Sequence, residues 1–110
     1  LSSMGADAPE DASELQDYLR AKHNADEYLK KSNLAYAIVR PGTLNNEIGT
    51  GKIALSEKLE RQGEISRDDV AQTLVRALHD STPFDQTFEI LKGEVLIGDA
   101  FDALSEGAKA

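Results

Sequence analysis

The stretch that decides the fold runs from residue 18 to residue 42 and reads YLRAKHNADEYLKKSNLAYAIVRPG. Its second part, LAYAIVR at residues 34–40, is a nearly continuous apolar run with β-branched residues, which is typical of a parallel strand covered on both faces. Pro41 and Gly42 end that run at once. Its first part has apolar residues at helical spacing. The stretch therefore predicts a helix followed by a buried strand, as in an α/β sheet.

We expect the helix to begin at a capping box formed by Ser13 and Gln16 and to end near residue 32, with Asn33 as a left-handed cap. The face predicted to be buried steps by three or four residues: Leu15, Tyr18, Lys22, Ala25 and Leu29. The opposite, solvating face carries charges: Asp17, Arg20, Asp26, Glu27, Lys30 and Lys31. A lysine among buried residues either extends its ammonium to solvent or contacts a ligand. Lys22 is therefore the first candidate functional residue.

The rest of the chain continues the alternation of helices and strands. A short strand is expected at residues 52–56, a helix capped by Ser66 with Asp69 bonding back, a strand at residues 86–91 and a short closing helix. The second helix carries the apolar stripe Val70, Ala71, Leu74, Val75 and Leu78, and the closing helix is marked by Ile97, Ala100, Phe101 and Leu104. This order predicts an α/β sheet with helical crossovers.

Composition excludes several function classes. The 110 residues carry a net charge of −8, which argues against nucleic acid or an anionic membrane as a partner. No apolar run approaches the roughly 20 residues of a membrane-spanning helix. The absence of cysteine excludes thiolate metal sites and fits a cytoplasmic protein. His23 and His79 have no second ligand at metal-binding spacing, so no metal site is expected.

Two predicted strand ends flank the first helix: Ser2-Ser3 at the start of the chain and residues 40–42 after the buried strand. Ligands of open α/β sheets bind beyond such ends. Tyr18 and Lys22 lie one turn apart on the helix between them, so a hydroxyl, a phenol and an ammonium are expected at one cleft. An ammonium stabilises a phenolate and lowers its pKa, which suits a tyrosine for proton transfer.

These residues resemble those of the short-chain dehydrogenase/reductase superfamily, and more narrowly its atypical NAD(P)-binding branch of NmrA-like and epimerase/dehydratase-like proteins. The resemblance covers residues 1 to about 104 and is carried by four segments in order: SSMGAD, AKHNADEYLKKSNLAYAIVRPGTL, GTGKI and ISRDDVA. It implies hydride transfer to or from a small carbonyl or alcohol substrate, with NADP or NAD as cofactor and NADP favoured.

The resemblance also implies individual roles. Tyr18 would be the proton donor or acceptor, Lys22 its electrostatic helper and a ribose contact, and Ser3, with Ser2 as the fallback, would orient the substrate oxygen. The residues implied to line the cofactor are Ser2, Lys22, Arg40, Pro41, Gly42, Thr43 and Leu44. The alternatives are structural: Tyr18 as a surface aromatic, Lys22 extended to solvent, and Ser2 and Ser3 as ordinary loop residues.

The glycine-rich phosphate loop of the superfamily does not occur in this sequence, and GTG at residues 49–51 is not expected between a strand and a helix. Residues 1–105 are therefore expected to form the C-terminal half of a Rossmann-like three-layer (αβα) parallel-sheet domain, with residues 106–110 as a tail. Two further hypotheses are a non-catalytic NAD(P)-binding regulator of the NmrA-like kind and a structural half-domain. The half-domain would self-associate or pair with the missing N-terminal half through its exposed sheet edge.

Overall fold

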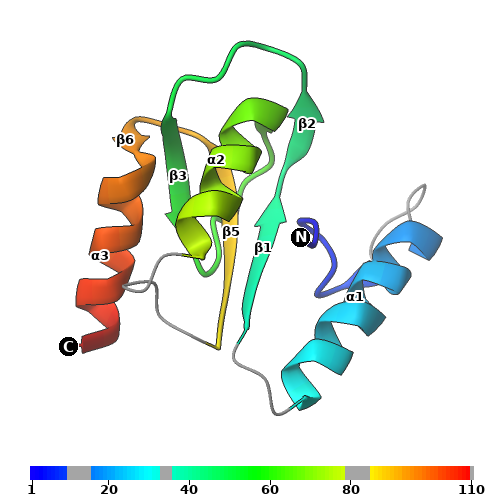
Figure 1. Cartoon of the computed structure of the whole chain (residues 1–110). Helices are drawn as coiled ribbons and strands as arrows, with labels where there is room; N and C mark the ends of the chain where they lie inside the picture. The colour runs from blue at the N-terminus through cyan, green and yellow to red at the C-terminus, as the bar shows by residue number, and fades with distance from the viewer. Residues whose placement is uncertain (10–15, 33–35, 79–84, 110) are drawn as a thin grey trace.

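The computed structural model of the chain describes residues 1–9, 16–32, 36–78 and 85–109. Helices and strands alternate within these residues (Figure 1). In chain order they are α1 (Gln16–Lys31), β1 (Ala37–Pro41), β2 (Thr43–Asn45), β3 (Lys52–Ser56), β4 (Glu64–Ser66), α2 (Arg67–Ala77), β5 (Gln86–Lys92), β6 (Val95–Leu96) and α3 (Ile97–Lys109). The expected α/β fold class is confirmed.

The main sheet has the strand order β1-β5-β3-β6. Its centre is the parallel pair β1 and β5, with Val39 opposite Phe88. On the other side of β5, β3 and then β6 pair in antiparallel fashion, so the expected parallel sheet also has an antiparallel side. A second sheet consists of the parallel pair β2 and β4. Since β1 and β5 run the same way, their carboxyl ends lie at one edge of the sheet, where ligands of α/β proteins bind.

The first residues of the chain lie beside β1. The Ser2 N–H donates to the Val39 carbonyl at 2.7 Å, and the Met4 N–H donates to the Pro41 carbonyl at 3.0 Å. This alternating pattern continues the parallel pairing of the sheet by one short segment. The two strand ends identified in the sequence are therefore neighbours in space.

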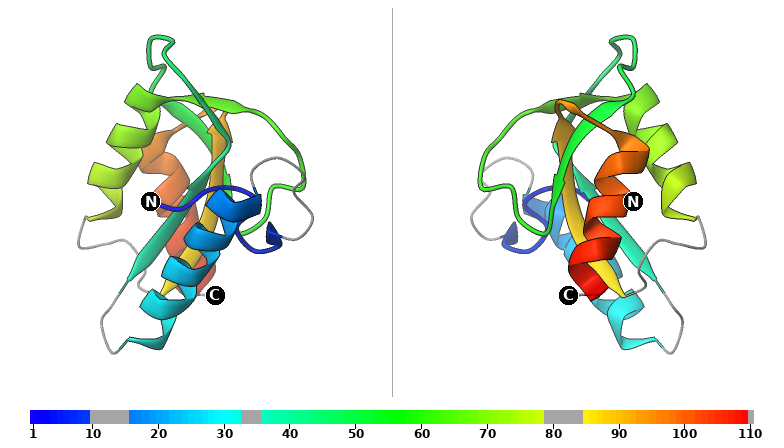
Figure 2. Two further views of the ribbon diagram at one scale, coloured as in Figure 1. Left: turned by 90° about the vertical axis from the view of Figure 1, so that its right-hand side faces the viewer. Right: turned by 90° about the vertical axis from the view of Figure 1, so that its left-hand side faces the viewer.

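Both helices after β1 contribute to one hydrophobic core. α2 lies on one side of the main sheet and the loop between β3 and β4 lies on the other (Figure 2), while α3 packs against β3 and α2. Phe88 and Phe101 meet edge to face at the centre, with ring centroids 5.4 Å apart. The buried core residues are Val39, Ile53, Ile65, Val70, Phe88, Ile90, Ile97, Ala100 and Phe101. This core holds the edge that carries the candidate site.

The predicted buried face of α1 is wrong. Tyr18 and Ala25 are exposed, whereas Leu19 and Asp26 are the buried residues of the helix. α1 lies at the margin of the sheet beside residues 1–9, the N-terminal segment (Figure 1). Only a narrow strip of the helix is therefore covered. Asp26, expected on the solvating face, is buried because its partners Ser2 and Arg40 lie on the sheet side.

The other predicted elements are found, with adjusted limits. The strand expected at residues 34–40 begins at Ala37 and includes Pro41, and the strand expected at 52–56 is β3. The apolar stripe of α2 is narrower than predicted, since Val75 and Leu78 are exposed while Val70 and Leu74 face the core. α3 continues to Lys109, through residues assigned to a tail. The predicted caps at Ser13 and Asn33 lie outside the described residues.

None of the described helices is both long and apolar enough to cross a membrane.

Candidate functional site

Lys22 joins α1 to the N-terminal segment. Its Nζ donates a hydrogen bond to the Leu1 carbonyl at 3.1 Å and lies 5.6 Å from the centre of the Tyr18 ring. An ammonium at this distance from an aromatic ring makes a cation–π contact. Only one of its three N–H donors has a partner among the described residues. The ammonium therefore stands between Tyr18 and the segment that carries Ser3, with donors left for a ligand.

Tyr18 is 49% exposed. No hydrogen bond joins its hydroxyl to another residue in the described part of the chain, so the phenol is open to a ligand from solvent. His23, on the next turn, is partly buried and its Nδ1 lies 2.9 Å from the Ala6 carbonyl oxygen. This second contact between α1 and the N-terminal loop helps to hold the helix face that carries Tyr18 against the sheet edge.

The side chains of Ser2 and Arg40 both bond to Asp26 and do not point to solvent. The Ser2 hydroxyl donates to Asp26 Oδ2 at 2.5 Å, and Arg40 donates to the same oxygen from Nη2 at 3.0 Å and from Nε at 3.2 Å. All three residues are buried. Their side chains lie beneath the site, where they connect the segments that form it.

Asp26 is a residue of the site that the sequence analysis missed. Two signals could have identified it: its position one turn after Lys22, which places both on one side of the helix, and an arginine at the end of a strand predicted to be buried. A buried arginine requires an anionic partner. α1 precedes this strand in the chain, so an acidic residue of α1 was the expected partner.

Ser3 is half-buried, and its hydroxyl lies 3.4 Å from the Met4 carbonyl oxygen. Residues 41–44, which are implied to line the cofactor, begin at the end of β1 next to the segment that carries Ser3. The Gly42 N–H donates to the Ile90 carbonyl at 3.1 Å, and the Thr43 N–H donates to the Gly63 carbonyl at 3.0 Å. Pro41 is buried, Thr43 is exposed and Leu44 packs against the core. Residues 41–44 thus run from the Ser3 segment toward β4 and β5.

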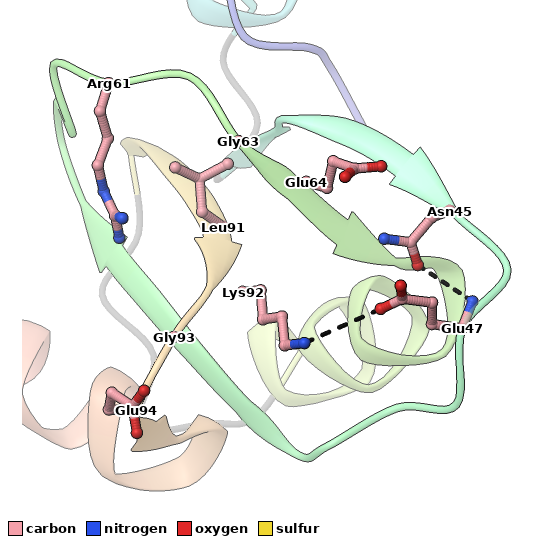
Figure 3. A pocket seen from close by; sticks show the side chains of 9 residues that line it. All are labelled: Asn45, Glu47, Arg61, Gly63, Glu64, Leu91, Lys92, Gly93 and Glu94. Atoms are coloured by element: carbon pink, nitrogen blue, oxygen red, sulfur yellow. Dashed lines mark hydrogen bonds and ion pairs between the residues drawn. The ribbon is translucent and has the colours of Figure 1, made fainter.

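A polar hollow of about 400 Å³ opens on the far side of residues 41–44. Figure 3 shows its lining, with Lys92 and Glu47 facing each other at an Nζ–Oε2 distance of 3.9 Å. The residues around it are Asn45, Glu47, Arg61, Gly63, Glu64, Leu91, Lys92, Gly93 and Glu94. It lies at the carboxyl end of β5. Two strand spacings, about 10 Å, separate that strand from the Ser3 segment.

The β2–β3 loop is fastened to the start of α2. Asp69 Oδ1 accepts from the Gly51 N–H at 2.9 Å, and its Oδ2 accepts from the Thr50 N–H at 3.2 Å. Ser66 caps the helix as predicted, since its hydroxyl accepts from the Asp69 N–H at 3.1 Å. Burial alone would raise the pKa of Asp69, but the hydrogen bonds from Gly51 and Thr50 outweigh it and hold that pKa below its ordinary value. The GTG segment is thus a structural loop.

The β3–β4 loop crosses the opposite side of the sheet and carries Arg61 to the hollow. Lys58 Nζ lies 2.6 Å from Asp7 Oδ2, and the Leu59 N–H donates to Glu89 Oε1 at 2.9 Å. The hydrogen bond from Lys58 lowers the pKa of Asp7, and the same bond raises the pKa of Lys58. Glu89 is buried in β5, so this carboxylate anchors the loop to the sheet.

Three comparisons with known proteins bear on this arrangement. YhfK of Bacillus subtilis (strain 168), an uncharacterized sugar epimerase, is 43% identical over 90 residues, which are 82% of this chain and 42% of that protein. A Bacillus halodurans protein assigned as an NAD-dependent epimerase/dehydratase superposes with a TM-score of 0.88 at 38% identity, over 93% of this chain and 49% of that one. The oxidoreductase ylbE of Lactococcus lactis gives a TM-score of 0.82 at 32% identity, over 96% and 50%.

The chain thus spans about half the length of the relatives that it matches. Their fold agrees with the Rossmann-like arrangement expected from the sequence. Residues 1–81 match the profile of NAD(P)H-binding proteins, a range that includes α1, the end of β1 and the N-terminal segment. By this match the chain belongs to the NAD(P)H-binding family.

Proposed function

We propose that this chain forms the catalytic side of an NAD(P)-dependent oxidoreductase or epimerase that acts on a small carbonyl or alcohol substrate. The observation that carries the proposal is the position of Lys22. Its ammonium contacts the Tyr18 ring at 5.6 Å and bonds the Leu1 carbonyl at 3.1 Å, two residues before Ser3. In this proposal the Tyr18 phenol, the Lys22 ammonium and the Ser3 hydroxyl act together at the strand ends where a ligand would bind.

Each of the three residues has a defined chemical task in this proposal. Tyr18 gives its hydroxyl proton to a substrate carbonyl oxygen during reduction and takes a proton from an alcohol during oxidation. The Lys22 ammonium stabilises the phenolate that forms, because an adjacent positive charge favours the ionised form. Ser3 donates a hydrogen bond that orients the substrate oxygen. The bound nicotinamide supplies or accepts the hydride at the substrate carbon.

The residues around Lys22 fit a nicotinamide dinucleotide. Two N–H donors of its ammonium have no partner among the described residues and are suited to ribose hydroxyls. Residues 41–44 extend from the Ser3 segment to the hollow, and position 42 is glycine where a Cβ atom would overlap Leu91 and Gly63. The cofactor is NADP or NAD, with NADP favoured. We assign to Pro41, Gly42, Thr43 and Leu44 the nicotinamide side of that site.

The hollow is assigned to the polar part of the substrate that lies away from the reacting carbon, because residues 41–44 lie between the hollow and Ser3. Leu91 is its one apolar residue other than glycine, while charged groups of both signs and an amide provide donors and acceptors. Such a lining favours polar groups over apolar ones. The names of the relatives point in the same direction, since one is called a sugar epimerase and another an epimerase/dehydratase. Both reactions act on a carbon that bears a hydroxyl group.

The first experiment is a titration of the chain with NADPH and with NADH, followed by nicotinamide fluorescence. The absence of tryptophan keeps the protein background low. Saturable enhancement is expected, with at least a tenfold weaker affinity in Lys22→Ala, about the effect of losing a charged hydrogen-bond donor. Lys31→Ala, which removes an exposed lysine at the far end of α1, is the matched control. Equal affinities in all three proteins would refute the assignment of Lys22.

A second candidate is a non-catalytic NAD(P)-binding regulator. The exposure of Tyr18 favours this candidate. Its side chain is 49% exposed and its hydroxyl has no hydrogen-bond partner among the described residues, as is common for a surface tyrosine without a catalytic role. A regulator needs Lys22 for the cofactor and does not need the Tyr18 hydroxyl. The two functions therefore differ in what Tyr18→Phe does to turnover.

A third candidate is an association module. Leu1 is 56% exposed, and on α1 Tyr28 is 80% exposed. The N-terminal segment bonds β1 and pairs with no second strand among the described residues, and an open strand edge favours pairing with another chain. Self-association, or binding of a separate N-terminal half, would raise the molar mass seen by light scattering. A constant monomer mass across concentrations would exclude self-association.

A further inference from the structure

Three separate segments of the candidate site meet on one oxygen atom. Asp26 Oδ2 accepts from the Ser2 hydroxyl at 2.5 Å and from Arg40 Nη2 and Nε at 3.0 and 3.2 Å. Ser2 belongs to the N-terminal segment, Asp26 to α1 and Arg40 to the end of β1. The side chains of Asp26 and Arg40 are each only 8% exposed. The catalytic residues assigned above come from these segments or lie next to this junction.

We propose that Asp26 is the positioning residue of this site: its carboxylate sets Ser3 at a fixed distance from Tyr18 and Lys22. This inference rests on the proposed function for its meaning, because the residues that it aligns are those assigned to catalysis. Asp26 itself is buried and acts through Ser2 and Arg40. It is not offered as a group that touches the substrate.

The first argument is the spacing on α1. Lys22 and Asp26 are one helical turn apart, so they lie on the same side of the helix. Lys22 Nζ holds the Leu1 carbonyl and Asp26 holds the Ser2 hydroxyl. Two successive residues of the N-terminal segment are thus held by two successive turns of α1. Ser3 is the next residue along, and it has little freedom to move once both are in place.

The second argument is the small apolar contact of α1. Apart from Asp26, Leu19 is the one residue of this helix that is buried. A single buried leucine provides little apolar contact for docking a helix of 16 residues. Charge-assisted hydrogen bonds in a buried place are stronger and more directional than apolar contacts. The orientation of α1 relative to the sheet edge therefore depends on Asp26.

The third argument separates positioning from simple helix docking. An Asp26–Arg40 ion pair alone would attach α1 to β1. The Ser2 hydroxyl is unnecessary for that purpose, yet it donates to the same Oδ2 that accepts from Arg40. This bond extends the network to the segment that carries Ser3. Removal of the Ser2 hydroxyl should then loosen that segment and leave the helix attached.

The test is amide hydrogen exchange measured by NMR on the chain and four variants. The Met4 amide reports the segment, since it bonds the Pro41 carbonyl, and the Phe88 amide reports the core. We expect Ser2→Ala and Asp26→Asn to lower the protection of Met4 by about tenfold, the effect of one lost hydrogen bond. Phe88 should be unchanged in Ser2→Ala. Asp17→Asn, which removes an exposed carboxylate from the same helix, is the matched control.

The double variant Ser2→Ala/Asp26→Asn completes a double-mutant cycle for the protection of the Met4 amide. If Ser2 acts through Asp26, the double variant loses no more Met4 protection than Asp26→Asn alone. Additive losses would overturn the proposal, and so would unchanged Met4 protection in Ser2→Ala. If Asp26→Asn lowers the protection of Met4 and Phe88 equally, the chain has opened globally. In that case the Met4 protection in Ser2→Ala decides whether the proposal holds.

A functional readout accompanies the exchange data. NADPH affinity should fall in Ser2→Ala by about tenfold while the melting temperature stays within a few degrees of the unsubstituted chain. A purely structural role would change the two together or neither. If the unsubstituted chain does not bind NADPH at all, the proposed function fails, and the exchange data still decide whether Asp26 fixes the segment.

Discussion

Arg40 and Asp26 form an ion pair inside the protein, with Nη2 3.0 Å from Oδ2 and both side chains 8% exposed. Removing two charges from water costs several kcal/mol for each, which their attraction offsets only if the remaining hydrogen-bonding capacity is used. The Ser2 hydroxyl and the second Arg40 donor use it here. This pair connects β1 to α1, so the stability of the chain and the geometry of the site depend on the same atoms.

Replacing Arg40 by Met leaves the Asp26 carboxylate buried without its cation. We expect the free energy of unfolding to fall by about 3–5 kcal/mol, the usual cost of breaking a buried pair from one side. Urea unfolding measures it. Arg40→Met/Asp26→Leu should recover most of the loss, because an apolar pair of similar volume carries no unpaired charge. Equal loss in the single and double variants would contradict this account.

Asp69 makes stability depend on pH in the acid range. Its pKa in the folded chain is lower than the ordinary value of 3.8, which it has in the unfolded chain. The ionised carboxylate therefore stabilises the folded state above that value, and the contribution is lost as the pH falls below it toward the folded pKa. Asp69→Asn should flatten the acid limb of stability measured by urea unfolding at several pH values. An identical acid limb in this variant would exclude Asp69 as its source.

Gly93 allows close contact between two strands at the rim of the hollow. A Cβ atom at this position would overlap the backbone of Ile53 and Ala54. Gly93→Ala should therefore lower the unfolding free energy by about 1–3 kcal/mol. Gly98→Ala is the matched control, because a Cβ atom there meets nothing within 4 Å and alanine favours a helix by up to about 1 kcal/mol. Thermal unfolding should move in opposite directions in the two variants.

Tyr18→Phe separates the enzyme from the regulator. We expect NADPH affinity to stay within about threefold, since Tyr18 has no hydrogen bond to lose among the described residues, while turnover falls by about 10²–10⁴. Turnover is followed by nicotinamide absorbance with a panel of small aldehydes, ketones and sugars. Tyr28→Phe, on the same helix and 80% exposed, is the control. Unchanged turnover in Tyr18→Phe would show that this hydroxyl is not the acid.

Local patterns were enough to predict most elements. β5 is within one residue of its predicted limits and β3 matches its prediction, because an apolar run bounded by turn residues leaves few alternatives. α2 begins after Ser66 as its capping signal indicates. The placement of Ser2 beside the end of β1 also followed from sequence, since parallel strands end at one edge.

What the sequence alone determined is the order of helices and strands, the α/β class and the family to which the motifs point, because each depends on neighbouring residues. Tertiary structure alone decided which side of α1 is buried. Leu29 and Tyr18 fit an amphipathic stripe, yet Leu19 and Asp26 are the buried residues. Asp26 is buried because an arginine 14 positions later and a serine 24 positions earlier bond to it. Periodicity measures the polarity of a helix face, whereas burial depends on partners that distant segments bring to it.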